Sequence, residues 1–394
     1  MPVVAIFALQ PLASFLSRLI PIVAPAMSAE FGWDGSSIGY LTAGNALGAL
    51  IILVVGSGIL KRVGGTRMLQ LSLLLGAVCL GLFVSPSLAV ALGACFVMGI
   101  STGVASPAGS EVLQRFSPPG MRNLIFSIKQ AGVPLGGMVA GLLAPLLIAL
   151  AGWRIALLLC GLLVVLPTAL TWRLSPAIDL RPSPAPPARP RRPSRPSLRV
   201  LAAPLASLTH NPNLLKMAIV GSLFAVAQSC WFTFSVIYLV DRLNYSLTLA
   251  GTVFAVMQVG GVLGRIVLGW LSDQWQSATG TLTVAAIFSA ATTALLGFTT
   301  SAWPLWSMIV LAFVAGATAA SWNGVQIAEV ARHSPPDHIA ETSAGSAIIV
   351  SLMNIVAPAV IAVFVTVSGR YDLAFLGASV CSLLVLGFLP RERG

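Results

Sequence analysis

Two arginines of this chain lie within long apolar segments. Arg18 falls in the apolar run 3–26 and Arg265 in the run 247–272. A charged side chain inside a bilayer is costly, so it generally faces protein or water and is either paired or functional. Two guanidinium groups that face one cavity would hold a small anion, because each forms paired hydrogen bonds to a carboxylate.

The spacing of the neighbouring polar residues favours this chemistry. Gln10, Ser14 and Arg18 recur every four residues, and Gln258 and Arg265 lie seven residues apart. Residues at these spacings share a helix face, and polar faces avoid lipid. We therefore predict substrate contacts for Ser14, Arg18, Gln258 and Arg265. The alternative is that an arginine snorkels to an interface or pairs with a backbone carbonyl.

Two further polar side chains are candidates for the same cavity. Lys129 lies near the start of an apolar run over 123–150, and Asn354 lies within a run over 340–367. We predict that both contact substrate. Lys129 has the alternative of snorkelling to the cytoplasm, and Asn354 that of a hydrogen bond between helices.

Acidic residues are missing from the middle of every apolar run. A cavity for cations needs a buried carboxylate, so the export of cationic drugs is disfavoured. Glu111, at the end of the run 88–112, is the candidate for coupling to protons. Its alternative is an ion pair at a helix end with Arg115, as for Glu329 with Arg332.

The composition requires that these residues sit in membrane helices. Of 394 residues, 57% are hydrophobic and 8% charged, and the mean hydropathy is +0.94. A soluble domain is about a quarter charged. Uninterrupted apolar runs are typical of spanning helices of about 20 residues rather than of barrel strands. We therefore expect an all-α integral membrane protein of the lipid bilayer.

Charge, glycine and proline delimit twelve expected spans in the chain. They cover 3–26, 36–60, 67–86, 88–112, 123–150, 153–173, 214–240, 247–272, 279–300, 303–329, 340–367 and 371–390. Many prolines and arginines occupy 174–213, which predicts an extended, disordered cytoplasmic linker. The expected domains are thus an N-terminal six-helix half, 1–173, the linker, and a C-terminal six-helix half, 214–394.

The basic residues predict the orientation in the membrane. The net charge of +11 fits cytoplasmic loops enriched in Lys and Arg better than it fits nucleic-acid binding. With both termini cytoplasmic, only Arg154, Arg242 and Arg370 fall outside. We expect a multi-pass protein of a bacterial-type cytoplasmic (inner) membrane, with its N-terminus as the first span rather than a signal peptide.

The two halves repeat each other. Ser117–Pro119 recurs as Ser334–Pro336, 217 residues later, and Gly99 pairs with Gly316 at the same offset. Earlier in the halves the offset is 212 residues, so that Gly39 pairs with Gly251. Repeated six-helix halves predict a substrate path at their interface near the bilayer midplane.

Twelve spans, a six-plus-six repeat and a basic central loop resemble the major facilitator superfamily over the whole chain. Gly269–Asp273 is similar to the family's G-x-L-a-D gating loop. The resemblance implies that Asp273 caps a helix N-terminus and pairs with basic residues, which latches the cytoplasmic side. The alternative for Asp273 is a solvated loop acid.

The first-half copy of this loop departs from the family pattern. Lys61 stands where the family has Asp, while Arg62, Gly64 and Arg67 match. The resemblance implies gating roles for Gly269 and Asp273 in the second half and for Arg62 and Arg67 in the first.

Shorter motifs resemble particular branches of the family. Arg18 matches the first-span Arg of the anion:cation symporter branch, but Ser17 replaces the adjacent Asp. Arg265 resembles the eighth-span Arg that binds carboxylate in monocarboxylate and oxalate porters. Gly132–Gly137 resembles the antiporter motif, with helix packing as the alternative. The fourth-span R-x-x-Q-G motif is absent.

These features predict a carrier, as a monomer, of small organic anions, most readily carboxylates. It would work by alternating access, with protons or a counter-anion coupled to transport. The alternative is an efflux carrier of hydrophobic or neutral compounds in which the arginines are structural. A membrane sensor or an intramembrane enzyme is a further class, but we find no catalytic constellation. We expect no cofactor and no metal site.

Overall fold

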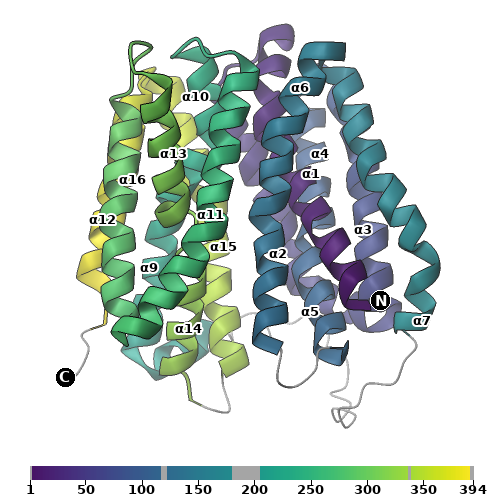
Figure 1. Ribbon diagram of the computed structural model, residues 1–394, viewed down its shortest axis with the longest axis vertical. Coiled ribbons are helices and arrows are strands. Elements are labelled where there is room, and N and C mark those ends of the chain that lie inside the picture. Colours follow the sequence, from purple (N-terminus) through teal and green to yellow (C-terminus); the bar gives the residue numbers. More distant parts are fainter. Residues whose placement is uncertain (1, 117–121, 180–204, 336–338, 391–394) are drawn as a thin grey trace. The chain divides into compact units, whose positions relative to one another are not determined.

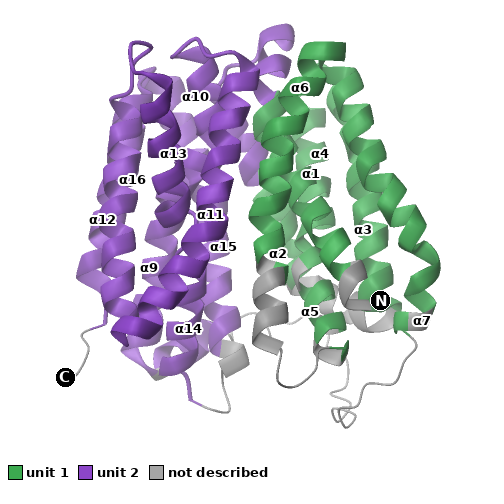
Figure 2. Cartoon of the chain, in the orientation of Figure 1, with its two compact units in different colours: residues 1–23, 44–197 green, residues 24–43, 198–394 purple. Residues whose placement is uncertain are grey.

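The structure is a computed structural model that describes residues 2–116, 122–179, 205–335 and 339–390. Within these ranges, side chains of some helical residues, including 54–62 and Glu111, lie outside the description. The described chain is almost wholly helical (Figure 1). It divides into two compact units, shown in Figure 2. Unit 1 contains residues 1–23 and 44–197, and unit 2 contains 24–43 and 198–394.

The first six expected spans are all helical. Their elements are α1 (Pro2–Phe31), α2 (Ser37–Val63), α3 (Gly65–Cys79) with a 3₁₀ extension at Leu80–Val84, α4 (Leu88–Gly103), α5 (Ala105–Phe116) and α6 (Arg122–Thr171). The continuous α6 holds two expected spans, with Gly152 between them at φ 80°. Glycine adopts positive φ without strain, so it turns the chain between the fifth and sixth spans.

The C-terminal half repeats this arrangement. Its elements are α9 (Pro212–Ser229), a π-helical turn (Cys230–Phe234), α10 (Ser235–Asp241), α11 (Leu247–Trp275), α12 (Ala278–Gly297), α13 (Leu305–Ala319), α14 (Asn323–His333), α15 (Ile339–Ser368) and α16 (Tyr371–Phe388). Side-chain caps begin three of them: Asn211 accepts from Asn213 N (3.0 Å), Ser246 from Leu249 N (3.2 Å) and Ser277 from Gly280 N (2.8 Å). Such caps satisfy amides that have no partner within the helix.

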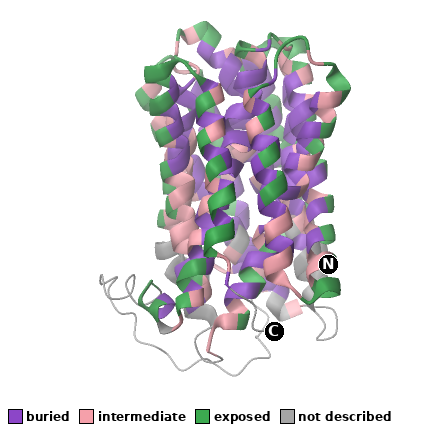
Figure 3. Cartoon of the chain, turned by 90° about the vertical axis from the view of Figure 1, so that its left-hand side faces the viewer, coloured by how far each residue is buried: buried purple, intermediate pink, exposed green. Residues whose placement is uncertain are grey.

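The expected twelve-span, all-α membrane fold is confirmed. Ten helical stretches of the described chain are long and apolar enough to cross a membrane, and Ser37–Leu53 is a shorter apolar helix. One stretch, Ala131–Leu174, contains two expected spans. Large apolar side chains such as Leu170 and Val367 are exposed, as lipid-facing residues are. Figure 3 shows exposed positions along the helices.

Matched glycines confirm the repeat. In unit 1, a Cβ on Gly99 of α4 would overlap the backbone oxygen of Asn45 on α2. In unit 2, a Cβ on Gly316 of α13 would overlap the backbone oxygen of Met257 on α11. The two glycines are 217 residues apart and their two contacts 212 apart, which are the offsets seen in the sequence. Each pair lets two helix backbones touch.

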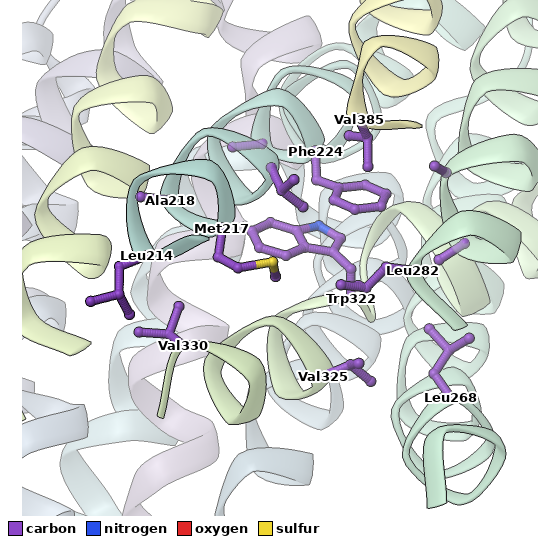
Figure 4. Packing of buried hydrophobic residues seen from close by; sticks show 14 of the residues in the cluster. Leu214, Met217, Ala218, Phe224, Leu268, Leu282, Trp322, Val325, Val330 and Val385 are labelled. Atoms are coloured by element: carbon purple, nitrogen blue, oxygen red, sulfur yellow. The ribbon is translucent and has the colours of Figure 1, made fainter. Parts of the chain in front are cut away.

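The core of unit 2 is built around Trp322 (Figure 4). Its ring stacks on Phe224 at 5.3 Å, and its Nε1 donates to the backbone oxygen of Ala319 at 3.0 Å. Met217 packs in the same apolar cluster. Trp322 is therefore a packing residue, placed directly before α14 and against α9.

The linker 174–213 differs from the expected extended chain where the structure describes it. Trp172–Leu174 forms a 3₁₀ turn, Ser175–Asp179 forms the short helix α7, and Leu208–His210 forms a second 3₁₀ turn. Residues 180–204 lie outside the described part. The many prolines and arginines predict one extended segment, but Asp179 lies among them and its carboxylate fixes α7 to α3.

Candidate functional site

A buried cation stands at the meeting of α1, α5 and α6. Lys129 on α6 is 2% exposed, and its Nζ donates to Ser110 Oγ on α5 at 2.7 Å. Burial at this level does not agree with the snorkelling alternative, in which the ammonium group would reach the aqueous interface.

Gln10 of α1 lies beside this lysine. The side chain is 3% exposed, and its buried Oε1 has no hydrogen-bond partner among the described residues. A Cβ on Gly109 of α5 would lie 3.0 Å from Gln10 Oε1 and 3.2 Å from Lys129 Cε. The glycine therefore allows side chains from two other helices to share the space in front of α5. We call Gln10, Ser110 and Lys129 the α1–α5–α6 cluster.

Ser14 and Arg18 continue along α1. Ser14 is half-buried where α1 packs against α6, and a Cβ on Gly136 would lie 2.9 Å from Ser14 Cβ. Arg18 is half-buried, with its Nε fully enclosed. Ser17 Oγ donates to the backbone oxygen of Ser14 at 3.0 Å. The serine that replaces the branch's Asp is thus satisfied within its own helix.

Arg265 sits at the junction of α11 and α13 in unit 2. Its Nη2 donates to the backbone oxygen of Ala320 at 3.4 Å. The carbonyl pairing foreseen as an alternative is therefore present, and it uses one of the five N–H donors of a guanidinium group. Gln258 is buried on the same helix, and Asn354 is half-buried on α15. Arg18 and Arg265 belong to different units, so their shared cavity stays a prediction.

A buried glutamine links three helices of unit 2. Gln326 Nε2 on α14 donates to the backbone oxygen of Met217 on α9 and to Ser346 Oγ on α15, both at 3.0 Å. Its amide is thus committed to helix packing, which is the role expected of most polar residues inside spans.

In the second-half gating loop, Asp273 does not cap the helix that follows. Asp273 lies exposed in the last turn of α11, and Gly269 has open space in place of a Cβ. The next helix, α12, is capped by Ser277 rather than by Asp273. The gating roles of Gly269 and Asp273 stay predictions.

In the first half, an acid from elsewhere in the chain occupies the N-terminus of α3. Asp179 Oδ1 accepts from Thr66 N and its Oδ2 accepts from Arg67 N, both at 3.0 Å. The Arg67 guanidinium lies 3.8 Å from the centre of the Trp172 ring. Gly64 has φ 88° and no room for a Cβ beside Asp179. The side chain of Arg62 lies outside the described residues.

Sequence reasoning missed Asp179, although one signal was available. It is the only acid in 174–213. A lone carboxylate just after a span has a natural partner in the unsatisfied amides at a helix start.

Glu111 and Glu329, two acids expected at helix ends, have different outcomes. Glu329 is buried and pairs with Arg332 at 2.6 Å and His333 at 3.2 Å, which confirms the ion pair expected at this helix end. The side chain of Glu111 lies outside the described residues, so its proton-coupling role stays a prediction. Among the described side chains, no group of three or more His, Cys, Asp or Glu could hold a metal ion.

The fold and its apolar helices define a multi-span membrane protein. The sequence model of the Major Facilitator Superfamily matches residues 6–358. The chain belongs to this family, as its repeat and loop motifs indicated.

Two relatives are named for aromatic acids. The chain is 26% identical over 283 residues to the 4-hydroxybenzoate transporter PcaK of Pseudomonas aeruginosa, a match that covers 64% of this chain and 61% of that protein. It is 25% identical over 275 residues to the gallate transporter of Pseudomonas putida, with the same two shares. The matches thus span less than two thirds of these relatives.

Solved structures show the same fold. The nucleoside transporter NupG aligns with a TM-score of 0.79 at 13% identity, over 99% of this chain and 100% of that chain. A bacterial homologue of the human lysosomal transporter Spinster aligns with a TM-score of 0.74 at 15% identity, over 98% and 94%. At these identities the likeness concerns the fold alone.

Proposed function

We propose that the chain is a secondary carrier of small organic anions, with carboxylates as the substrate class. The observation that carries the proposal is Lys129, a cation buried among α1, α5 and α6. Arg18 and Arg265 add two half-buried cations on apolar helices. A cation removed from water favours an anion bound nearby in the low-dielectric interior, whether or not the two groups are in direct contact. The relatives named for aromatic acids support the same class.

In this proposal the two arginines bind the carboxylate, and the polar side chains orient the substrate. Ser14, Gln258, Lys129 and Asn354 supply hydrogen bonds. Alternating access moves the two halves around the substrate, and Arg62, Arg67, Gly269 and Asp273 gate the cytoplasmic side. Glu111 is the candidate for coupling to protons, with exchange against a counter-anion as the other route.

We propose the cytoplasmic membrane of a bacterium as the location, with both termini inside and the carrier acting as a monomer. The distribution of basic residues supports this orientation, because it leaves only Arg154, Arg242 and Arg370 on the outer side. Each of the three has a local partner that offsets its charge or orders its side chain: the Trp153 ring, the backbone oxygen of Gly369, and Asp372, respectively.

A ligand screen on the purified protein tests the substrate class. A ligand at a hundred times its dissociation constant stabilises the folded protein by about 2.7 kcal/mol. We expect carboxylates to raise the melting temperature of the wild type, and Arg18→Ala and Arg265→Ala to abolish the rise. Arg370→Ala is the control, because Arg370 is exposed and pairs with Asp372 at 2.6 Å. Sugars and organic cations should have no effect.

The second candidate is an efflux carrier of hydrophobic or neutral compounds. The hydrogen bond from Arg265 to the Ala320 oxygen favours it, because it gives that arginine a structural partner. If neutral compounds stabilise the wild type and both arginine variants equally while carboxylates do nothing, this second function replaces the first.

A further inference from the structure

The α1–α5–α6 cluster has a counterpart in unit 2 that differs in chemistry. At the 217-residue offset, Gly109 corresponds to Gln326 and Lys129 corresponds to Ser346. In unit 2 the glutamine amide bonds to Ser346 Oγ and to the Met217 backbone oxygen, each at 3.0 Å. That junction is neutral and its donors are satisfied within the protein.

The same junction in unit 1 holds a different set of groups. Glycine takes the place of the glutamine and lysine takes the place of the serine. The result brings the Lys129 ammonium group and the Gln10 amide into one buried space, with Ser110 as a ligand of the ammonium. Packing alone does not require this set, because unit 2 closes the equivalent junction without any charge.

Gln10 Oε1 supplies the second observation. It is fully buried and accepts no hydrogen bond from any described residue. Buried polar atoms in folded proteins are nearly always bonded, so an exception needs an explanation. A donor that arrives with the substrate is such an explanation.

We propose that the α1–α5–α6 cluster binds a hydroxyl group of the substrate, an inference that rests on the proposed anion transport. A hydroxyl group both donates and accepts hydrogen bonds. It can donate to Gln10 Oε1 while it accepts from the Lys129 ammonium. A carboxylate has only acceptors and would meet the amide oxygen unfavourably, and an alkyl group would satisfy neither side chain.

The position of Arg18 indicates where the carboxylate end of the substrate would bind. Arg18 follows Gln10 by eight residues, which is roughly 12 Å along a helix at ~1.5 Å per residue. The arginine side chain extends over part of this length. The remainder fits a small molecule with a carboxylate at one end and a hydroxyl group at the other. The substrate class is therefore a hydroxylated organic acid.

Competing uptake into proteoliposomes tests this inference with the full-length protein. The probes are 4-hydroxybenzoate, 4-methoxybenzoate and benzoate, with lactate and propionate as an aliphatic pair. We expect the wild type to prefer each hydroxylated acid over its partner on the order of tenfold, the effect of one hydrogen bond to a group otherwise left unpaired. The methoxy compound keeps an acceptor but lacks the donor, so it should behave as benzoate.

Two variants test whether the α1–α5–α6 cluster causes the preference for hydroxylated acids. Gln10→Met keeps the size of the side chain and removes the amide oxygen, so the preference should fall to about one while uptake of the unhydroxylated acid persists. Gln326→Met is the matched control, because it removes a buried amide from the equivalent junction of unit 2. It should lower the melting temperature and leave the preference unchanged.

Three results would overturn the inference. One is equal uptake of the methoxy and hydroxy compounds by the wild type, which needs no variant to fold. Another is an unchanged preference in Gln10→Met. The third is uptake of benzoate or propionate without any preference for the hydroxylated acid, which leaves anion transport intact. If no acid is transported at all, the proposed function fails and the subsite fails with it.

Discussion

At the scale of single residues, Lys129 is a buried charge, which stability alone does not favour. Its ammonium group is enclosed by three helices and bonds to Ser110. Replacing a buried charge with an apolar residue of similar volume is often neutral or stabilising, because the desolvation penalty disappears. Substitution therefore distinguishes a lysine that binds substrate from a lysine that stabilises the fold: the first loses uptake without losing stability.

We expect Lys129→Met to leave the melting temperature unchanged or higher and to reduce organic anion uptake by more than about tenfold, the loss of one charge-assisted hydrogen bond. Lys216→Met is the control, because Lys216 is exposed on α9. Uptake and thermal unfolding are measured on the same preparations. A strongly destabilised Lys129→Met protein with normal uptake per folded molecule would assign the lysine to packing instead.

At the scale of elements, α7 fastens the end of the sixth span to the start of the third. Asp179 accepts from two of the backbone amides that open α3, and Arg67 lies over the Trp172 ring just before α7. Helix N-termini carry partial positive charge, so a carboxylate there is favourable as both acceptor and anion. Lys61, near the end of α2, stands where the family motif has Asp, and an acid from another part of the chain thus lies at the start of the next helix.

We expect Asp179→Ala to destabilise the protein by about 1 kcal/mol, the usual effect of losing an N-terminal cap. Asp179→Asn keeps an acceptor but not the charge and should lose less. Adding Lys61→Asp to Asp179→Ala should restore part of the loss, since it places a carboxylate near the end of α2, shortly before the same helix begins. Thermal unfolding of the four proteins is the measurement. Equal stability of Asp179→Ala and wild type would mean that water replaces the carboxylate at no cost.

At the scale of the whole molecule, the two halves share matched close contacts between a glycine and a neighbouring helix. Gly99 and Gly316 each admit a neighbouring helix backbone, at matched positions of the two halves. Because the same close approach is built twice, a side chain at either position should disturb its own half in the same way.

We expect Gly99→Val and Gly316→Val each to destabilise the protein by at least about 1–3 kcal/mol, because a side chain there must push two backbones apart. Gly93→Val and Gly377→Val are controls on α4 and α16, where a Cβ meets nothing within 4 Å. The yield of monodisperse protein and its melting temperature are the readouts. If the first pair behaves like the control pair, the helices do not need this contact.

Much of this protein follows from the sequence because its determinants are local. Apolar runs long enough to span a bilayer predict the helices, and Gly152 permits the turn within α6. The repeat offsets predict which glycines of the two halves occupy equivalent positions. The same reasoning selected Arg18, Lys129 and Arg265, since a charge in an apolar run is visible without any structure.

Only the tertiary structure decides what each polar residue does within its span. Gln10 and Gln326 look alike in sequence, yet one has an unpaired oxygen beside a lysine and the other bonds to two helices. Asp179 meets α3 across more than a hundred residues. Such contacts depend on how helices pack against each other, and helix packing joins positions whose separation in the chain carries no periodic signal.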